Sequence, residues 1–318
     1  MERVGWIDFL RGFSMILILA FHTEVYYKEE AATPYYIYTT NAIILFYFIS
    51  GYLFYRQEAF QLKKRLKSIV RSMLFPYFIF TSLIAIPKLM VRHSEINWME
   101  IATNILTGNA SWFIAALIIA EIFFSLLLWI SRGKHIWLSI AAIVCFITYF
   151  IIPIDLHSFW QWHDALLALF FLYLGYVCHQ KSYFFHMINS LFLSLLLLIV
   201  LIIIKVGEYY VDLPMRNIAI NHACLFLSDA VIWLIWVISI IRYIPKCKMI
   251  EWTGKYSIIY YFLCGGCPLI TSMLMNRIGF SYDGFLYRYL LTLVVVYIFA
   301  TAITWFIVRY IPILTGKR

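Results

Sequence analysis

The stretch SWFIAALIIAEIFFSLLLWI, residues 111–130, contains a single charged residue, Glu121. A helix of about 20 apolar residues is about 30 Å long, which matches the hydrocarbon core of a bilayer. Of all 318 residues, 64% are hydrophobic and 13% are charged, and soluble domains have about twice that charged fraction. The chain is therefore an integral membrane protein, with no room for a soluble catalytic domain.

Nine further apolar runs, bounded by charged residues or by Pro and Gly, predict helices in the rest of the chain. They lie near 7–25, 37–55, 70–91, 136–152, 163–178, 188–206, 222–243, 257–275 and 286–308. The continuous apolar pattern excludes the alternation of a β-barrel, and backbone groups in lipid must bond within their own helix. The expected fold class is all-α, with ten spans in one integral-membrane domain over residues 1–318.

The basic residues predict how these helices are oriented. With a cytoplasmic N-terminus, all but seven of the 25 Lys and Arg residues fall on the cytoplasmic side. The seven are Lys28, Lys88, Arg92, Lys205, Arg216, Arg277 and Arg288. A missed span would reverse every later loop, so this bias favours an even number of spans and two cytoplasmic termini. Because orientation accounts for much of the net charge of +9, nucleic acid is not an expected partner.

Charged groups in the first span are candidates for function, because each costs a few kcal/mol to insert. Asp8 and Arg11 lie three residues apart on one face, and His22 follows eleven residues after Arg11. Eleven residues return to within about 20° of the same face and rise roughly 16 Å. Arg11 and His22 are thus expected to point into one cavity from different depths. The alternative is that Asp8 pairs with Arg11 while His22 caps a helix end.

Six short motifs follow one another along the chain. They are Arg11-Gly12-Phe13 with His22, Phe46-Tyr47-Phe48-Ile49-Ser50-Gly51-Tyr52, the basic run from Lys63 to Arg71 ahead of Pro76-Tyr77, Ser111-Trp112-Phe113 with Leu117, Phe170-Phe171-Leu172-Tyr173-Leu174-Gly175-Tyr176, and Gly254-Lys255-Tyr256-Ser257 with Tyr260. In this order they resemble the membrane acyltransferase 3 family of bacteria. The resemblance spans most of the chain. It implies a multi-pass enzyme of the inner (cytoplasmic) membrane that moves an acyl group from acyl-coenzyme A to a hydroxyl.

The resemblance also implies separate roles for the charged residues of the first span. His22, expected in the outer half of the membrane, is the candidate general base for the acceptor hydroxyl, since a neutral histidine accepts a proton near pH 7. Arg11 lies nearer the cytoplasm, where the expected donor, acetyl-coenzyme A, is made. The expected acceptor is a cell-surface saccharide or its lipid-linked precursor.

The basic run is expected to be a cytoplasmic loop that binds coenzyme A. Guanidinium groups bind phosphate oxygens in pairs, so Arg65 and Arg71 are the leading candidates. Lys67 and Ser50 are further candidates, although Ser50 with Gly51 also permits close packing of helices. The alternative for the run is a cluster that contacts anionic lipid and orients the chain.

Two carboxylates deep in apolar spans, Glu121 and Asp229, need partners or water. Asp229 is expected in the outer half, where it could orient His22. Glu121 lies near mid-depth and could pair with a basic group from the donor side. For both residues, a structural hydrogen bond is an open alternative to catalysis.

The cysteines and histidines predict no metal site and no disulfide framework, because their spacing is irregular. Cys264 occupies a position where many members of the family have a histidine. The segment 264–268, with two glycines and Pro268, is expected to break its helix beside a cavity.

Two other functions remain open on the sequence. A transporter, either a proton-coupled carrier or a polysaccharide exporter, would also use buried charges within spans. The other function is that of a structural subunit of a glycan-assembly complex, but it does not explain why charged residues lie within the spans. Binding of coenzyme A separates the acyltransferase from both.

Overall fold

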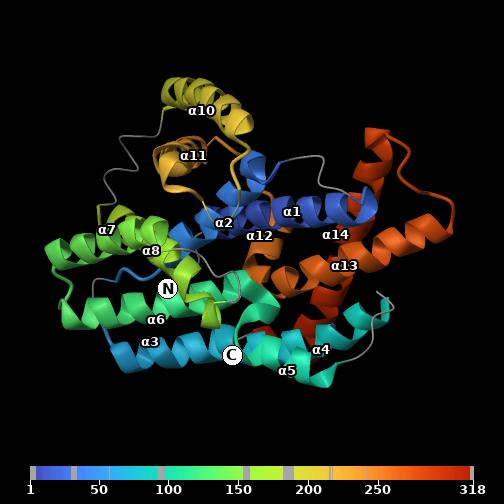
Figure 1. The fold of residues 1–318 in the computed structure, drawn as a ribbon, viewed down its shortest axis with the longest axis horizontal. Coiled ribbons are helices and arrows are strands. Elements are labelled where there is room, and N and C mark those ends of the chain that lie inside the picture. Colours follow the sequence, from blue (N-terminus) through green and yellow to red (C-terminus); the bar gives the residue numbers. More distant parts are fainter. Residues whose placement is uncertain are drawn as a thin grey trace. The chain divides into compact units, whose positions relative to one another are not determined.

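The computed structural model describes most of the chain (Figure 1). The described residues are 5–29, 34–56, 58–91, 97–152, 158–181, 190–214, 216, 218–241 and 243–315. They form helices joined by turns, and no strand occurs among them. The all-α fold class is therefore confirmed.

The helices follow the apolar runs of the sequence. The α-helices are α1 (Gly5–Tyr27), α2 (Tyr35–Tyr52), α3 (Leu62–Ile69), α4 (Phe75–Val91), α5 (Trp98–Leu106), α6 (Trp112–Ile130), α7 (His135–Ile151), α8 (Trp162–Gln180), α10 (Leu191–Val211), α11 (Ala223–Ile240), α12 (Lys248–Lys255), α13 (Ser257–Arg277) and α14 (Leu286–Tyr310). Short turns of other helix types are η1 (Val70–Leu74), η2 (Asn109–Ser111), η3 (Phe159–Gln161), η4 (Ile220–His222) and η5 (Pro312–Thr315). Each of the ten expected spans coincides with a helix.

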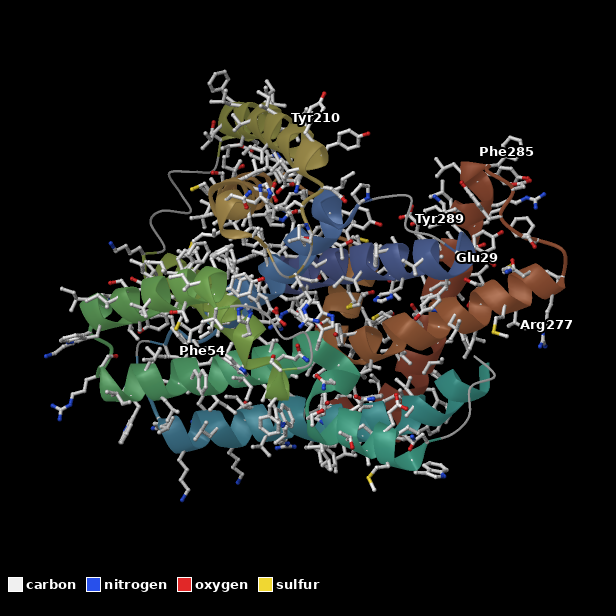
Figure 2. All side chains as sticks on the ribbon, viewed as in Figure 1. Glu29, Phe54, Tyr210, Arg277, Phe285 and Tyr289 are labelled. Atoms are coloured by element: carbon white, nitrogen blue, oxygen red, sulfur yellow. The ribbon has the colours of Figure 1, made fainter. Side chains whose placement is uncertain are left out.

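Seven helical segments of the described part are long and apolar enough to cross a membrane. They are Gly5–Tyr27, Leu62–Ala85, Asn109–Ile130, Leu191–Val211, Ile220–Ile240, Ser257–Arg277 and Leu286–Tyr310. The apolar helices Ile37–Tyr52 and His135–Ile151 are shorter. Exposed apolar side chains cover the outer surfaces of several spans, as on α10 around the 81% exposed Tyr210 (Figure 2). The chain is a multi-pass membrane protein, and the count of ten and the cytoplasmic termini remain predictions.

The chain divides into two compact units, each made of segments that are distant in sequence. The first comprises Met1–Thr33, Val70–Ser111 and Cys247–Arg318, and the second comprises Pro34–Ile69 and Trp112–Lys246. The first therefore contains α1, α4, α5 and α12 to α14, and the second contains α2, α3, α6 to α8, α10 and α11.

Paired glycines let helices meet at backbone distance inside each unit. In the first unit, an added Cβ at Gly12 of α1 would overlap the backbone of α12, and one at Gly254 of α12 would overlap that of α1. In the second unit, an added Cβ at Gly51 of α2 would overlap the backbone of α8, and one at Gly175 of α8 would overlap the backbone of α2. No larger residue fits at these positions, which explains why all four glycines lie in the sequence motifs. The predicted close packing at Gly51 is confirmed.

The basic run is helical, so the expectation of a loop there is wrong. Leu62, Leu66 and Ile69 recur at helical spacing on one face of α3, and this face packs against α6. The π-helical turn η1 then leads into α4, just before Pro76. Since proline has no N–H to complete the regular ladder, a local change of helix type is expected there.

The helix α13 continues through the segment that was expected to break it. It runs from Ser257 to Arg277 with Pro268 inside. Cys264 and Cys267 are buried on either side of the two glycines, so packing holds the helix where proline removes one hydrogen bond. An added Cβ at Gly265 or Gly266 would meet nothing within 4 Å.

Candidate functional site

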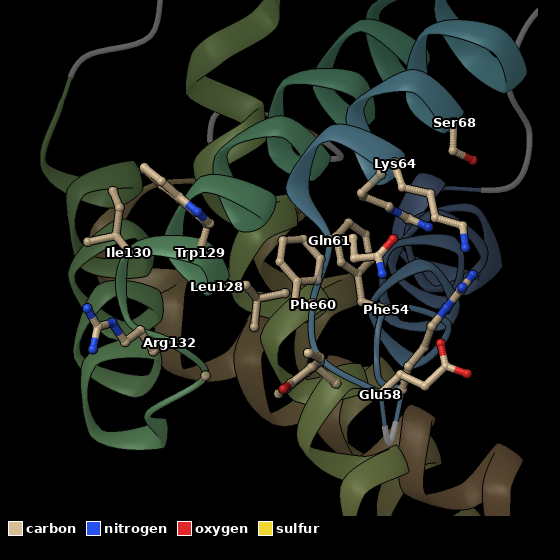
Figure 3. Close-up of a pocket in the computed structure, with 15 residues that line it drawn as sticks. Phe54, Glu58, Phe60, Gln61, Lys64, Ser68, Leu128, Trp129, Ile130 and Arg132 are labelled. Carbon is tan, nitrogen blue, oxygen red and sulfur yellow. The ribbon is translucent and has the colours of Figure 1, made fainter.

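A cavity of about 870 Å³ lies in the second unit (Figure 3). Its walls come from the segment that follows α2, from α3, from the end of α6 and from α8. The charged residues that line it are Arg56, Glu58, Lys64, Arg65 and Arg132. Its aromatic residues are Phe54, Phe60, Trp129 and Tyr176. The lining contains four cations and only one carboxylate, so its net charge is positive. The cavity therefore favours an anionic ligand that also has an apolar or aromatic part.

Arg65 is held at this cavity by two side chains of the second unit, one of which is itself held by a third. One guanidinium nitrogen, Nη2, lies 3.0 Å from Oε2 of Glu121, which is buried. The guanidinium carbon lies 3.6 Å from the ring centroid of Phe54. Ser50 donates a hydrogen bond to the other oxygen of Glu121. These contacts fix the plane of the guanidinium.

The Nε of Arg65 is buried and has no hydrogen-bond partner in the described part of the chain. A buried donor without a partner costs free energy, and a bound acceptor would recover it. Arg65 therefore has one unsatisfied buried donor beside the cavity that its side chain lines.

The structure brings together only some of the predicted coenzyme ligands. Arg65 lines the cavity, and Ser50 acts on it through Glu121. Lys67 is exposed on α3 and lines a neighbouring groove, while Arg71 is exposed on η1, in the first unit, and is not a lining residue.

Arg56 and Arg132 are lining residues that the sequence did not single out as ligands, whereas Lys64 belongs to the basic run that was expected to bind coenzyme A. Arg56 and Arg132 were counted only among the cations on the expected cytoplasmic side. That shared side was the one signal for these two residues, because four α-helices, α3 to α6, separate them in sequence.

In the first unit, Arg11 and His22 lie on α1, which is an uninterrupted helix. Their spacing therefore does place them on one face. Both are half-buried, and the imidazole of His22 stacks with the ring of Tyr26 at 6.3 Å between centroids. Their roles as base and donor ligand remain predictions.

Glu24, a buried carboxylate near the end of α1, was not predicted from the sequence. Glu24 is 2% exposed and forms an ion pair of 3.2 Å with Lys28. The ammonium of Lys28 also lies 5.1 Å from the ring centroid of Tyr282 and 4.9 Å from that of Tyr289. Tyr289 donates a hydrogen bond to the carbonyl of Ala20. The spacing of four between Glu24 and Lys28 was the signal for this pair.

Asp229 belongs to a buried network in the second unit. Lys205 donates to Asp229 at 2.8 Å, to Glu208 at 3.0 Å and to Asn41 at 2.8 Å. Asn41 in turn donates to Asp229 at 2.7 Å. These contacts support the structural alternative for Asp229. The orientation of His22 by Asp229 stays a prediction, because the two residues belong to different units.

A further ion pair of this unit joins Arg216 to Asp164. Arg216 also donates to Gln161 and lies over the ring of Trp112, 4.6 Å from its centroid. The backbone of Gln161 is left-handed, with φ of 52°, which is an uncommon conformation for a residue other than glycine. Neither Asp164 nor Gln161 was predicted to have a role.

Comparison with known proteins agrees with the motifs and the fold. Residues 4–309 match the sequence model of a family described as an acyltransferase domain, acyltransferase 3. The match covers nearly the whole chain, so the molecule is a membrane acyltransferase. It belongs to the acyltransferase 3 family. Neither a curated protein nor a solved structure matches it.

Proposed function

We propose that this membrane acyltransferase moves an acetyl group from acetyl-coenzyme A to a hydroxyl of a cell-surface saccharide or of its lipid-linked precursor. The observation that carries the proposal is the cationic cavity of the second unit, with its aromatic walls. Its volume of about 870 Å³ lies within the range of cavities that bind small molecules and cofactors.

The charges of the cavity suit the phosphates of coenzyme A. The coenzyme has a diphosphate and a ribose phosphate, and the cavity presents Arg56, Lys64 and Arg132 besides the fixed guanidinium of Arg65. Charge-assisted hydrogen bonds of this kind are about twice as strong as neutral ones. The ring of Trp129 offers a flat face on which the adenine base would stack.

The expected topology supports the same assignment. All four cations fall on the expected cytoplasmic side, where acetyl-coenzyme A is made. A proton-coupled carrier would need no cavity for a nucleotide with three phosphates.

Transfer of the acetyl group requires a base and a positioned donor. The acceptor oxygen attacks the thioester carbonyl, the C–S bond breaks, and the thiolate of coenzyme A leaves. His22 takes the proton of the acceptor hydroxyl as this oxygen attacks. Arg11 helps to place the donor's thioester end, and a planar guanidinium suits this task better than an ammonium group.

Titration of purified protein with coenzyme A tests the donor site. The variant Arg56→Gln with Lys64→Gln and Arg132→Gln removes three cations that line the cavity. The matched control, Lys63→Gln with Lys67→Gln and Lys181→Gln, removes three exposed cations that do not line it. Each charge-assisted bond contributes about 1.5 to 3 kcal/mol, so the first variant should bind at least about a hundredfold more weakly. The control should bind as the unaltered protein does.

Two results would count against this donor site. Unchanged affinity in the cavity variant would remove the cavity from donor binding. A loss confined to the control would place the coenzyme on the exposed face of α3, with Lys67. Comparing the acetyl content of surface glycans with and without the protein then identifies the acceptor hydroxyl.

A further inference from the structure

A groove of about 710 Å³ lies along the exposed side of α3, in the second unit. It is lined by three lysines, Lys63, Lys64 and Lys67, and by the apolar or aromatic side chains of Phe60, Leu62 and Trp129. All three lysines are exposed, so the groove opens on the surface of this unit. We call it the α3 groove.

The α3 groove adjoins the cationic cavity, but part of its lining is its own. Phe60, Lys64 and Trp129 line both the groove and the cavity (Figure 3). Lys63 and Lys67 line only the groove. Substituting these two lysines therefore tests the groove without changing the lining of the cavity.

The positive charge of the groove is not compensated. Lys67 follows Lys63 by four residues and Lys64 by three, so the three side chains lie within about 100° around the axis of α3. Like charges at such a spacing destabilise a helix. No acidic residue belongs to α3 or lines the groove, and no described residue forms an ion pair with any of the three lysines. A bound anion would remove this repulsion.

The groove lies where two candidate membrane spans end. The span Leu62–Ala85 begins at a lining residue, and the span Asn109–Ile130 ends one residue after Trp129. Trp129 is 59% exposed, and tryptophan favours the boundary between hydrocarbon and headgroups. Lysine side chains near the end of a span extend toward the same boundary. The three ammonium groups are therefore expected at the depth of the lipid phosphates.

We propose that the α3 groove binds the headgroup of one anionic phospholipid. The lipid phosphate lies among the three lysines, and the first carbons of an acyl chain contact Leu62 and Trp129. The lysines fall on the expected cytoplasmic side, where the membrane surface is negatively charged. Each basic residue near an anionic headgroup contributes about a fivefold gain in affinity, so three should favour an anionic over a neutral lipid by about a hundredfold. This site does not depend on the proposed acetyl transfer.

Lipid binding to the purified protein can be measured by native mass spectrometry from detergent. Dioleoylphosphatidylglycerol and dioleoylphosphatidylcholine have the same chains and differ in headgroup charge. We expect the unaltered protein to retain one phosphatidylglycerol per chain, with a preference of about a hundredfold over phosphatidylcholine.

The groove variant, Lys63→Gln with Lys67→Gln, leaves Lys64 as the last lysine of the groove. Its preference for phosphatidylglycerol should fall to about fivefold. The matched control, Lys134→Gln with Lys181→Gln, removes two other exposed lysines of the same unit that do not line the groove. This control should keep the full preference, and so should Lys63→Arg with Lys67→Arg, which retains the charge. Coenzyme A binding should be unchanged in the groove variant, because the lining of the cavity is intact.

Four results would overturn the proposal. Equal retention of the two lipids by the unaltered protein would exclude a headgroup site. The same loss of preference in the groove variant and in its matched control would mean that lysines attract anionic lipid without a site. Full preference in the groove variant together with weaker coenzyme A binding would assign the groove to the coenzyme. A dimer that the groove variant dissociates would mean that a second copy of the chain occupies the groove.

Discussion

Arg65 and Glu121 form an ion pair with 3.0 Å between the guanidinium Nη2 and the carboxylate Oε2. Glu121 lies deep in α6 and is 5% exposed, whereas Arg65 lines the cationic cavity. The pair therefore joins a buried carboxylate to a guanidinium group that lines the cavity. Removing one partner of such a pair is more costly than replacing both, because the remaining charge stays in an apolar environment.

We predict that Glu121→Ala lowers the free energy of unfolding by about 3 to 5 kcal/mol, since it leaves Arg65 without its counter-charge. Glu121→Gln retains hydrogen-bonding oxygen and nitrogen and should cost less. Thermal unfolding in detergent measures both. Ser125→Ala on the same helix is the control, because among the described residues the Ser125 hydroxyl bonds to its own helix backbone, at the carbonyl of Glu121. A loss in Glu121→Ala no larger than in this control would show that the pair is unimportant for stability.

We predict that His22→Ala slows acetyl transfer by a factor of about 10² to 10⁴, which is the usual contribution of a general base. His22→Gln should fail as well, because an amide does not accept the proton. The measurement is transfer of labelled acetyl groups, with coenzyme A binding as a check on folding. Tyr26→Phe is the matched control, since it keeps the ring that stacks on His22. Turnover of His22→Ala near that of the unaltered protein would exclude His22 as the base.

The positions of the helices could be predicted because membrane spans have a strong local signal. Each expected run coincides with a helix, and the glycine of the Ser50-Gly51 motif does mark a close approach. Glu121 also has the kind of partner that its charge required, a residue of the basic run. In each of these cases the prediction rested on a property of the residue or segment itself: an apolar run, a missing side chain or a charge within an apolar helix.

The composition of the cavity could not be predicted in the same way. Its cations Arg56 and Arg132 come from segments separated by four α-helices, and only packing brings them together. The basic run was assigned to a loop because its charges obscured the apolar face formed by Leu62, Leu66 and Ile69. The network of Lys205 was not predicted either, because its members lie on three helices that only packing brings together.

A conservative substitution distinguishes two possible roles of Arg11, which are placing the donor and balancing the charge of Asp8. We predict that Arg11→Lys impairs transfer, because a single ammonium group does not reproduce the planar fork that places the donor. Steady-state kinetics should show the loss mainly as a higher KM for acetyl-coenzyme A. Full activity in Arg11→Lys would indicate that Arg11 only balances the charge of Asp8. Restoration of Arg11→Ala by Asp8→Asn would indicate the same.

The contacts of the glycines predict that replacing glycine with alanine has opposite effects on stability at two positions. Gly254→Ala should destabilise the protein by about 1 to 3 kcal/mol or more, because its Cβ would overlap the backbone of α1. Gly265→Ala, within a helix and with nothing near its added Cβ, should instead stabilise by about 0.4 to 1 kcal/mol. Thermal unfolding of the two variants side by side measures the contrast. Equal effects at the two positions would contradict the packing of α1 on α12.

The network around Lys205 allows a test of whether Asp229 serves the reaction or only the fold. Lys205→Met leaves the carboxylates of Asp229 and Glu208 buried without a cation, so we predict a loss of about 3 to 5 kcal/mol in unfolding free energy. Adding Asp229→Asn and Glu208→Gln removes the unpaired charges and should recover most of that stability. Acetyl transfer by this stable neutral variant then decides the role. Activity close to normal assigns the network to structure, whereas a loss of more than about a hundredfold, the lower limit for a missing acid or base, assigns Asp229 to the reaction.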